Sequence, residues 1–254
     1  MVALPIYPLI MKMRLDVYLS DKGLVTSRTE AKGFITSGEV TVNGKIITKP
    51  SFDVCDDDKI SVNSESKKYV SRGGLKLEEA LKRFEIDPKC RLAIDVGASS
   101  GGFTDCLLKH GASKVISVDS GSGQMALSLR NDERVFVIEN YNARYMKAED
   151  LPYTPDIAVM DVSFISATLI MPALYNCLGD RADFICLIKP QFEVGRSGLR
   201  KGGIVKSEKL RREAVDKVVD FALSIGFRSL GVINSPISGG DGNIEFLAHF
   251  RKGN

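Results

Sequence analysis

Four charged residues stand where the surrounding sequence is apolar, and their types suit proton and charge chemistry. Asp161 follows the run "DIAVM", Lys189 follows "ADFICLI", and Glu245 lies within the strand-like run "NIEFLAHF". Lys76 comes just before an apolar stripe at helical spacing, beside the face that should be buried. Each residue alone also has a purely structural explanation. Asp161 can be a capping acid, Lys189 a strand-end lysine, Lys76 a snorkelling lysine and Glu245 an edge-strand glutamate. Together they predict a shared site at one rim of a sheet.

A glycine-rich turn forms a second candidate site, and its neighbours are acids. The stretch "DVGASSGGFTD" places Gly97 and Gly101 between an apolar run and a predicted helix, where a ligand can approach the backbone closely. Asp95 lies beside the turn, and Asp119 ends the next predicted strand, where it can accept hydrogen bonds from a ribose. The spacing is not GxGxxG and no P-loop lysine follows, so both nucleotide fingerprints are absent. A plain strand-to-helix turn explains the glycines, but the pair of acids favours a cationic ligand such as S-adenosylmethionine.

An alternation of strands and helices must position these residues. From residue 91 onward the strand-like runs are "RLAIDVG", "KVISVD", "RVFVIEN", "DIAVMDVSF" and "ADFICLIKP". A long amphipathic helix, "SEKLRREAVDKVVDFALSIG", precedes the runs "SLGVINSPI" and "IEFLAHF". This order predicts an α/β fold in which helices cover both faces of a mainly parallel sheet. Ligands of such sheets bind at the carboxyl ends of the strands.

Residues 13–62 predict a separate small α+β domain. Its order is two short helices, a β-hairpin about the Asn43-Gly44 turn signal, and a further strand in "DDDKISV". Basic residues fall on or beside the helices, whereas the three aspartates at 56–58 lie in a distant loop. Such segregation favours one positive face for phosphates, and a solvated charged surface is the other reading. The basic residues are Arg14, Lys22, Arg28 and Lys32.

Composition and termini indicate a cytoplasmic protein. The net charge of +3 permits a polyanionic partner without requiring one. The five cysteines are odd in number and form no CxxC pair, so neither a disulfide framework nor a metal site is predicted. No stretch approaches the roughly 20 apolar residues that span a bilayer. We expect residues 1–12 to be a flexible lead-in and residues 63–70 a flexible linker, in which Lys67, Lys68 and Tyr69 are further candidates for RNA contact.

The small domain as a whole resembles the S-four RNA-binding domain. That resemblance implies binding of structured RNA through the basic helical face. The domain occurs in several enzyme families, so it implies a class of partner and no particular reaction. The matching features include Arg-Leu-Asp at 14–16, Ser27-Arg28, Ala31, Ile35, Gly38 and Asn43-Gly44.

The large domain carries a more specific resemblance. Its charged residues match, in order and setting, the Lys-Asp-Lys-Glu tetrad of the FtsJ-like ribose 2′-O-methyltransferases: Lys76, Asp161, Lys189 and Glu245. With "VSRGGLKL", "MDVSFIS", "LIKPQFE", "GNIEF" and the small domain, they resemble the TlyA family of cytidine 2′-O-methyltransferases of ribosomal RNA, some labelled haemolysins. The resemblance implies a Rossmann-like class I methyltransferase sheet over residues 71–254, S-adenosylmethionine as cofactor, no metal, and ribosomal RNA or ribosomal subunits as partner.

The resemblance also implies a role for each residue. Lys189 would orient or deprotonate the ribose hydroxyl, Asp161 would position Lys189, and Glu245 would hold Lys76. To act as a base, Lys189 must be neutral part of the time, which burial or the neighbouring Lys76 would favour. The cofactor contacts carried over by motif are Asp95, Gly97, Ser99, Gly101, Phe103, Asp119 and Asp161, with Asn140 near the adenine.

Two residues of the large domain extend the predicted RNA surface. Arg72 lies in "VSRGGLKL", and Phe164, after "DVS", has the right type to stack on an exposed base. Core packing is the other reading of Phe164. The linker reads "KKYV" where some relatives carry an Arg and a Trp, so any coupling between the domains through it stays open.

Two other classes of function remain to be weighed. A non-catalytic RNA-binding or ribosome-assembly factor would keep the fold without the reaction, and the intact tetrad argues against it. A membrane-damaging haemolysin would need a spanning segment, a signal peptide or a strongly amphipathic basic helix, and none is visible in the sequence. The modified nucleotide, the ribosomal subunit and the oligomeric state are left open.

Overall fold

The computed structural model describes residues 12–25, 27–36, 38–62, 68–195, 198–200, 202–239 and 242–253, without the side chains of Thr29 and Glu30. The chain divides into two compact units, Met1–Ser66 and Lys67–Asn254. The predicted lead-in up to residue 11 and the predicted linker from residue 63 to 67 lie outside the described residues. Each unit has a hydrophobic core of its own.

The small unit packs two helices, α1 (Leu15–Asp21) and α2 (Arg28–Thr36), on short strands. Leu15 and Ile35 have no exposed surface and form the centre of its core. The predicted hairpin is confirmed: φ is 51° at Asn43 and 77° at Gly44, the left-handed pair that a type I′ turn requires. The strands are β1 (Met13–Arg14), β2 (Val40–Val42), β3 (Lys45–Ile46), β4 (Asp53–Val54) and β5 (Ile60–Val62).

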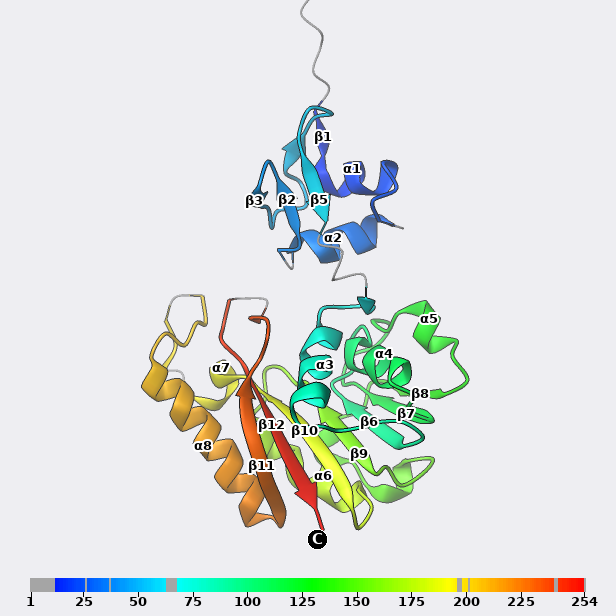
Figure 1. Cartoon of the computed structure of the whole chain (residues 1–254), viewed down its shortest axis with the longest axis vertical. Helices are drawn as coiled ribbons and strands as arrows, with labels where there is room; N and C mark the ends of the chain where they lie inside the picture. Colours follow the sequence, from blue (N-terminus) through cyan, green and yellow to red (C-terminus); the bar gives the residue numbers. More distant parts are fainter. Residues whose placement is uncertain are drawn as a thin grey trace, which may run out of the picture. The chain divides into compact units, whose positions relative to one another are not determined.

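The large unit is built on a sheet whose order, within the described residues, is β11-β12-β10-β9-β6-β7-β8 (Figure 1). Strand β12 is antiparallel to both of its neighbours, and the other pairs are parallel. The strands are β6 (Leu92–Val96), β7 (Lys114–Val118), β8 (Val135–Ile138), β9 (Ile157–Met160), β10 (Ala182–Ile188), β11 (Phe227–Asn234) and β12 (Phe246–Lys252). The α/β fold with a mainly parallel sheet is therefore confirmed.

Helices cover both faces of this sheet (Figure 1). The α-helices are α3 (Gly73–Arg83), α4 (Gly102–Lys109), α5 (Leu127–Arg130), α6 (Met171–Cys177), α7 (Pro190–Glu193) and α8 (Glu208–Ser224). Three short 3-10 helices of the described residues are η2 (Ala143–Tyr145), η3 (Ala148–Asp150) and η4 (Ala167–Leu169). None of the helices in the described ranges is long and apolar enough to cross a membrane.

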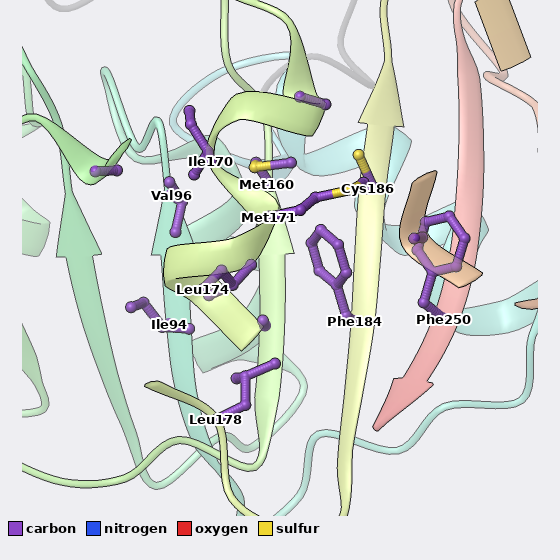
Figure 2. Close-up of a cluster of buried hydrophobic side chains, with 14 of the residues drawn as sticks. Ile94, Val96, Met160, Ile170, Met171, Leu174, Leu178, Phe184, Cys186 and Phe250 are labelled. Carbon is purple, nitrogen blue, oxygen red and sulfur yellow. The ribbon is translucent and has the colours of Figure 1, made fainter. Parts of the chain in front are cut away.

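The face under α6 and α8 holds a core of aliphatic and aromatic side chains. Figure 2 shows Met171 and Leu174 of α6 with Phe184 of β10 and Phe250 of β12. The two phenylalanines are fully buried, and their ring centroids lie 5.7 Å apart. Each large apolar side chain buried in this way stabilises the fold by roughly 1.5–3 kcal/mol, so the strand ends are held on a rigid support.

Helices α3, α4 and α5 cover the opposite face, where Leu77 and Leu107 have no exposed surface. Side chains alternate between the two faces along each strand. In β6, Ile94 and Val96 therefore belong to the core under α6, and Ala93 belongs to the core under α3 and α4.

The order of the strands reverses beside β6, because β7 and β8 continue on one side and β9 and β10 on the other. In open α/β sheets, ligands bind at such a reversal, outside the carboxyl ends of the strands. The loops after β6, β7, β8 and β9 meet at this edge.

The end of the predicted linker differs from expectation. Tyr69 is 4% exposed and packs in the core under α3 and α4. The N–H of Val70 donates to Asp105 Oδ2 at 2.8 Å, and Lys109 Nζ lies 5.2 Å from the centroid of the Tyr69 ring. A Cβ at Gly74 would overlap this ring. Tyr69 thus anchors the start of α3, and its interpretation as an RNA contact is wrong because the ring is in the core.

Candidate active site

Lys76 and Glu245 form a buried ion pair at the rim of the sheet. Helix α3 begins at Gly73, so Lys76 lies in its first turn. Lys76 Nζ lies 2.5 Å from Glu245 Oε2, and the side chains are 10% and 2% exposed. Glu245 directly precedes β12, whereas the sequence predicted that it lies inside the strand. Charges removed from water in this way are tolerated only when each keeps its partner.

Lys189 and Asp161 form a second ion pair at the same rim. Lys189 Nζ lies 2.5 Å from Asp161 Oδ1 and donates a hydrogen bond of 2.8 Å to Ser163 Oγ. Asp161 directly follows β9, and its own N–H donates to the carbonyl of Val96 at the end of β6. The side chains of Lys189 and Asp161 are 12% and 22% exposed. Asp161 thus fixes the direction of the Lys189 ammonium at the strand ends.

Strand register brings the two pairs to one place. Ile188, the last residue of β10, lies opposite Phe246, the first residue of β12. Lys189 follows Ile188, and Glu245 precedes Phe246, so both stand at the same end of adjacent antiparallel strands, where facing residues lie about 4.5–5.5 Å apart. Four charged side chains from four separate segments therefore gather at this rim.

A cavity of about 480 Å³ opens beside Asp161, the one residue of the two pairs that lines it among the described residues. Residues of the loops that follow β6, β7, β8 and β9 line it. It therefore lies at the edge of the sheet where the reversal of strand order predicts a ligand site. Among the residues that the structure describes, its lining contains two carboxylates, those of Asp119 and Asp161, and no Lys, Arg or His. The lining residues are Val96, Gly97, Ser99, Val118, Asp119, Ser120, Gln124, Tyr141, Asn142, Ala143, Asp161, Val162, Ser163, Phe164, Ile165 and Ile170. A larger groove, of about 710 Å³, lies along β11 and contains none of the predicted site residues.

Gly97, Ser99 and Asp119 take the positions predicted for them at this cavity. A Cβ at Gly97 would overlap the carbonyl oxygen of Asp161, so the loops after β6 and β9 touch only because glycine stands here. Asp119 accepts backbone hydrogen bonds of 2.7 Å from Ser99 and from Gly121. These bonds fix the carboxylate and leave it lone pairs for a ligand hydroxyl.

Asp95 is placed differently from the prediction. It has no exposed surface, and it does not line the cavity. The alternation along β6 turns its side chain toward α4, where Thr104 Oγ1 donates to Oδ2 at 2.7 Å. Asp95 Oδ1 has no hydrogen-bond partner among the described residues. Burial raises the pKa of Asp95 to about 7, and the nearby charges of Asp161 and Asp119 act in the same direction.

Three other residues predicted to contact the cofactor do not line the cavity: Gly101, Phe103 and Asn140. Gly101 caps α4 with φ of 94°, and a Cβ there would overlap Leu129. Phe103 is 3% exposed and packs against Gly73 at the start of α3. Asn140 has φ of 55° and is exposed, while the residues directly after it line the cavity. Gly101 and Phe103 thus have a structural role at the starts of α4 and α3.

Phe164 is 92% exposed, which excludes core packing. Its backbone has φ of 65°, in the left-handed region that a bulky residue rarely adopts. The ring packs on Phe192 with centroids 5.2 Å apart and an interplanar angle of 51°. An exposed aromatic ring at the mouth of a cavity, in a strained conformation, is typical of a binding surface.

In the small unit, two of the predicted RNA-binding residues share one buried acid. Arg14 Nε lies 2.9 Å from Asp16 Oδ1, and Arg28 Nη2 lies 3.3 Å from Asp16 Oδ2. The two guanidinium side chains remain 48% and 55% exposed. The hydrogen bond from Arg14 lowers the pKa of Asp16 to about 2, and Arg28 adds to this effect. Asp16 thus holds two arginines at the surface.

The predicted separation of basic and acidic residues in the small unit is wrong at Lys22. Lys22 Nζ lies 2.8 Å from Asp56 Oδ1, so the acidic loop reaches the end of α1. The side chain of Lys22 is nevertheless 48% exposed, and Lys32 on α2 is exposed. In the large unit, Arg72 is half-buried and precedes α3.

Sequence reasoning missed five polar residues of the cavity: Ser120, Gln124, Tyr141, Asn142 and Ser163. Ser163 bonds to Lys189, and Gln124 accepts a hydrogen bond of 3.0 Å from Ser99 Oγ. Tyr141, Asn142 and Ser163 come soon after strand ends, so the rule that located Asp161 applies to them as well. Within the described residues, no group of His, Cys, Asp and Glu side chains is arranged to hold a metal ion.

Comparison with known proteins agrees with this geometry. The sequence matches the FtsJ-like methyltransferase family over residues 69–252 and the S4 domain over residues 13–60. A 16S/23S rRNA (cytidine-2′-O)-methyltransferase TlyA from Mycobacterium tuberculosis is 42% identical over 241 residues, which is 94% of this chain and 90% of the relative. Hemolysin A from Brachyspira hyodysenteriae is 44% identical over 239 residues, which is 94% of this chain and 99% of the relative.

Similarity in structure leads to the same family. The solved structure of a hemolysin-named protein from Streptococcus thermophilus superposes with a TM-score of 0.77 at 42% identity, covering 96% of this chain and 90% of that one. The family match covers both ion pairs and the whole cavity. The chain therefore belongs to the FtsJ-like methyltransferase family, and it is a methyltransferase whose cofactor is S-adenosylmethionine.

Proposed function

We propose that this chain methylates the ribose 2′-hydroxyl of a cytidine in ribosomal RNA, with the four residues of the two ion pairs as its catalytic residues. The observation that carries the proposal is the gathering of Lys76, Glu245, Lys189 and Asp161 at one rim of the sheet, where Asp161 also lines an acidic cavity. The relative named as a cytidine-2′-O-methyltransferase supports the choice of substrate. The small unit would hold the RNA, and ribosomes as substrate would make the cytosol the place of action.

The cavity fits the cofactor by charge. S-adenosylmethionine carries an ammonium and a sulfonium, and the described lining residues offer two carboxylates and no cation. A pyrophosphate would be repelled there. The volume of about 480 Å³ lies within the usual range of small-molecule sites. Asp119 would accept hydrogen bonds from the ribose hydroxyls, and Asp161 would lie near the positive centre. When bound, the cofactor supplies a methyl group that is already electrophilic.

Lys189 orients the acceptor hydroxyl in this proposal. A carboxylate lies 2.5 Å from its nitrogen and fixes the direction of its hydrogen-bond donors. Among the described residues, Lys189 donates one hydrogen bond to Ser163 and forms an ion pair with Asp161. A remaining N–H of Lys189 could fix the 2′-oxygen for attack on the methyl group. The bound cofactor would supply the methyl group, and the proton released from the hydroxyl would pass to water.

The Lys76–Glu245 pair holds the other side of the acceptor site. Its charges cancel, so it adds hydrogen-bond donors beside Lys189 without adding net charge. Glu245 fixes the direction of Lys76, and a Cβ at Gly239 would overlap Glu245 Oε1, so the loop before β12 encloses this carboxylate. The pair is a rigid support for the sugar.

RNA contacts complete the proposal. Phe164 would stack on the base of the target nucleotide, because its ring is exposed at the mouth of the cavity. The basic residues proposed to contact RNA phosphates are Arg14, Lys22, Arg28, Lys32 and Arg72.

Transfer of radiolabel from S-adenosylmethionine to unmethylated ribosomal subunits tests the function. The proposal expects label in the RNA with the wild type and a loss of about 10²-fold or more with Lys189→Met, while binding of S-adenosylhomocysteine stays within about threefold. Tight binding to subunits without any transfer of label would favour the assembly factor. Equal losses of cofactor binding and transfer would remove Lys189 from the acceptor site.

A further inference from the structure

Helix α7 contacts the loop after β9 at three successive points. At its start, Lys189 bonds to Asp161 and Ser163. In its middle, Phe192 packs on Phe164. At its end, the carboxylate of Glu193 reaches the far end of the loop, where η4 begins. The segment "KPQFE" at 189–193 and the loop at 161–167 are therefore held side by side along their whole length.

Of these three contacts, the one made by Glu193 has the most hydrogen bonds. Its Oε1 accepts the backbone N–H of Ala167 at 2.8 Å, and its Oε2 accepts the hydroxyl of Ser166 at 2.6 Å. Lys217 of α8 donates to Oε2 and to the Glu193 carbonyl, both at 3.0 Å. The Glu193 side chain is 2% exposed. A buried carboxylate with this many donors is held in one position.

The loop needs such an anchor because its central residue is strained. Phe164 holds a left-handed backbone, which costs an L-residue roughly 1–2 kcal/mol, and its exposed ring is packed on one side only. Such a conformation persists only where the surroundings enforce it. The bond that Lys189 donates to Ser163 and the bond that Ser166 donates to Glu193 hold the loop on each side of Phe164.

We propose that Glu193, held in place by Lys217, is a positioning residue for the acceptor nucleotide. It fixes the loop after β9 so that the Phe164 ring and the Lys189 ammonium keep one separation, which sets the base and the 2′-oxygen of one nucleotide at once. This inference rests on the proposed function. Within the described parts of the chain, Glu193 bonds neither to the cavity lining nor to the four paired side chains, so its effect passes through the loop.

Two series of variants test the inference. Glu193→Ala removes the anchor, Glu193→Gln keeps an acceptor and loses the charge, and Lys217→Met removes the cation. Lys209→Met is the matched control, because Lys209 lies on the same helix with its partner Glu213 at 3.9 Å, and it is 85% exposed. We expect kcat to fall about 10²-fold in Glu193→Ala and about tenfold in Glu193→Gln and Lys217→Met, with S-adenosylhomocysteine affinity within about threefold and no change in the control.

The second series reads the loop without RNA. The chain contains no tryptophan, so Phe164→Trp creates a single fluorescent reporter. Fluorescence anisotropy of that reporter should drop when Glu193→Ala or Lys217→Met is added and should stay constant with Lys209→Met. Circular dichroism below the melting temperature checks that each variant is folded.

The outcomes are separable. A folded Lys217→Met with unchanged kcat and unchanged anisotropy would overturn the inference, and Glu193 would then serve stability alone. If the wild type transferred no methyl group to RNA, the proposed function would fail, and the anisotropy series would still decide whether Glu193 orders the loop.

Discussion

Cutting one side of the Lys76–Glu245 pair should destabilise the large unit, and cutting both sides should not. The side chains are 10% and 2% exposed, so each single variant, Lys76→Met or Glu245→Gln, leaves a charge or polar group buried without its partner. Breaking a buried pair costs roughly 3–5 kcal/mol. In a unit of this size, about 2–4 °C of melting temperature corresponds to 1 kcal/mol, so we expect a loss of about 6–20 °C. The double variant, which buries no unpaired charge, should regain most of it.

Methyl transfer measured on the same proteins separates support from chemistry. If the pair holds the acceptor sugar, the double variant stays at least about 10²-fold slower than the wild type although its stability returns. Lys82→Met, on the exposed side of the same helix, is the control for loss of a lysine from α3. A double variant that is both stable and active would mean that the pair is only a structural staple. Single variants that melt within about 2 °C of the wild type would refute the argument from burial.

Further predictions concern the cavity and its surroundings. Asp119→Ala should weaken S-adenosylhomocysteine binding at least about tenfold in calorimetry, because a fixed acceptor for ribose hydroxyls is lost; unchanged affinity would place the ribose elsewhere. Phe164→Ala should raise KM for ribosomal subunits and lower kcat, with cofactor affinity within about threefold, and an effect on cofactor binding alone would contradict base stacking. Because the pKa of Asp95 is raised to about 7, the folded state keeps a proton that unfolding releases. The stability contributed by this group is therefore present below about pH 4 and is lost as the pH rises to about 7. The difference in the free energy of unfolding in urea, wild type minus Asp95→Asn, should therefore fall by up to about 4 kcal/mol between about pH 4 and pH 8. A difference that does not change with pH would contradict the burial argument.

The sequence located the residues whose signal is local. Lys189 and Asp161 follow long apolar strands, and strand ends of a parallel sheet meet at one edge, so their meeting at the rim was predictable. The Asn43-Gly44 hairpin was predictable because few dipeptides accept two left-handed residues. Lys76 and Glu245 are 169 positions apart, and although their apolar settings predicted a shared rim, only the match to a known motif suggested that they form a pair.

Other features depend on packing that periodicity does not record. Asp95 was expected at the cavity, but being one residue before the strand end turns its side chain to the other face of the sheet. Tyr69 looked like part of a polar linker, and only the groove left by Gly74 makes room for its ring. The pairing of Lys22 with Asp56 joins segments whose approach depends on the fold of the small unit. Glu193 gave no signal, because its partners come from a loop and a helix far away in the sequence.

Mass-spectrometric mapping of ribose methylation in ribosomal RNA tests the central claim most directly. Unmethylated subunits are incubated with S-adenosylmethionine and either the wild type or Lys189→Met. The account predicts a 2′-O-methylcytidine that forms with the wild type and is absent or strongly reduced with the variant. A methyl group on a base, or the same 2′-O-methylcytidine formed at an undiminished rate by the variant, would contradict it.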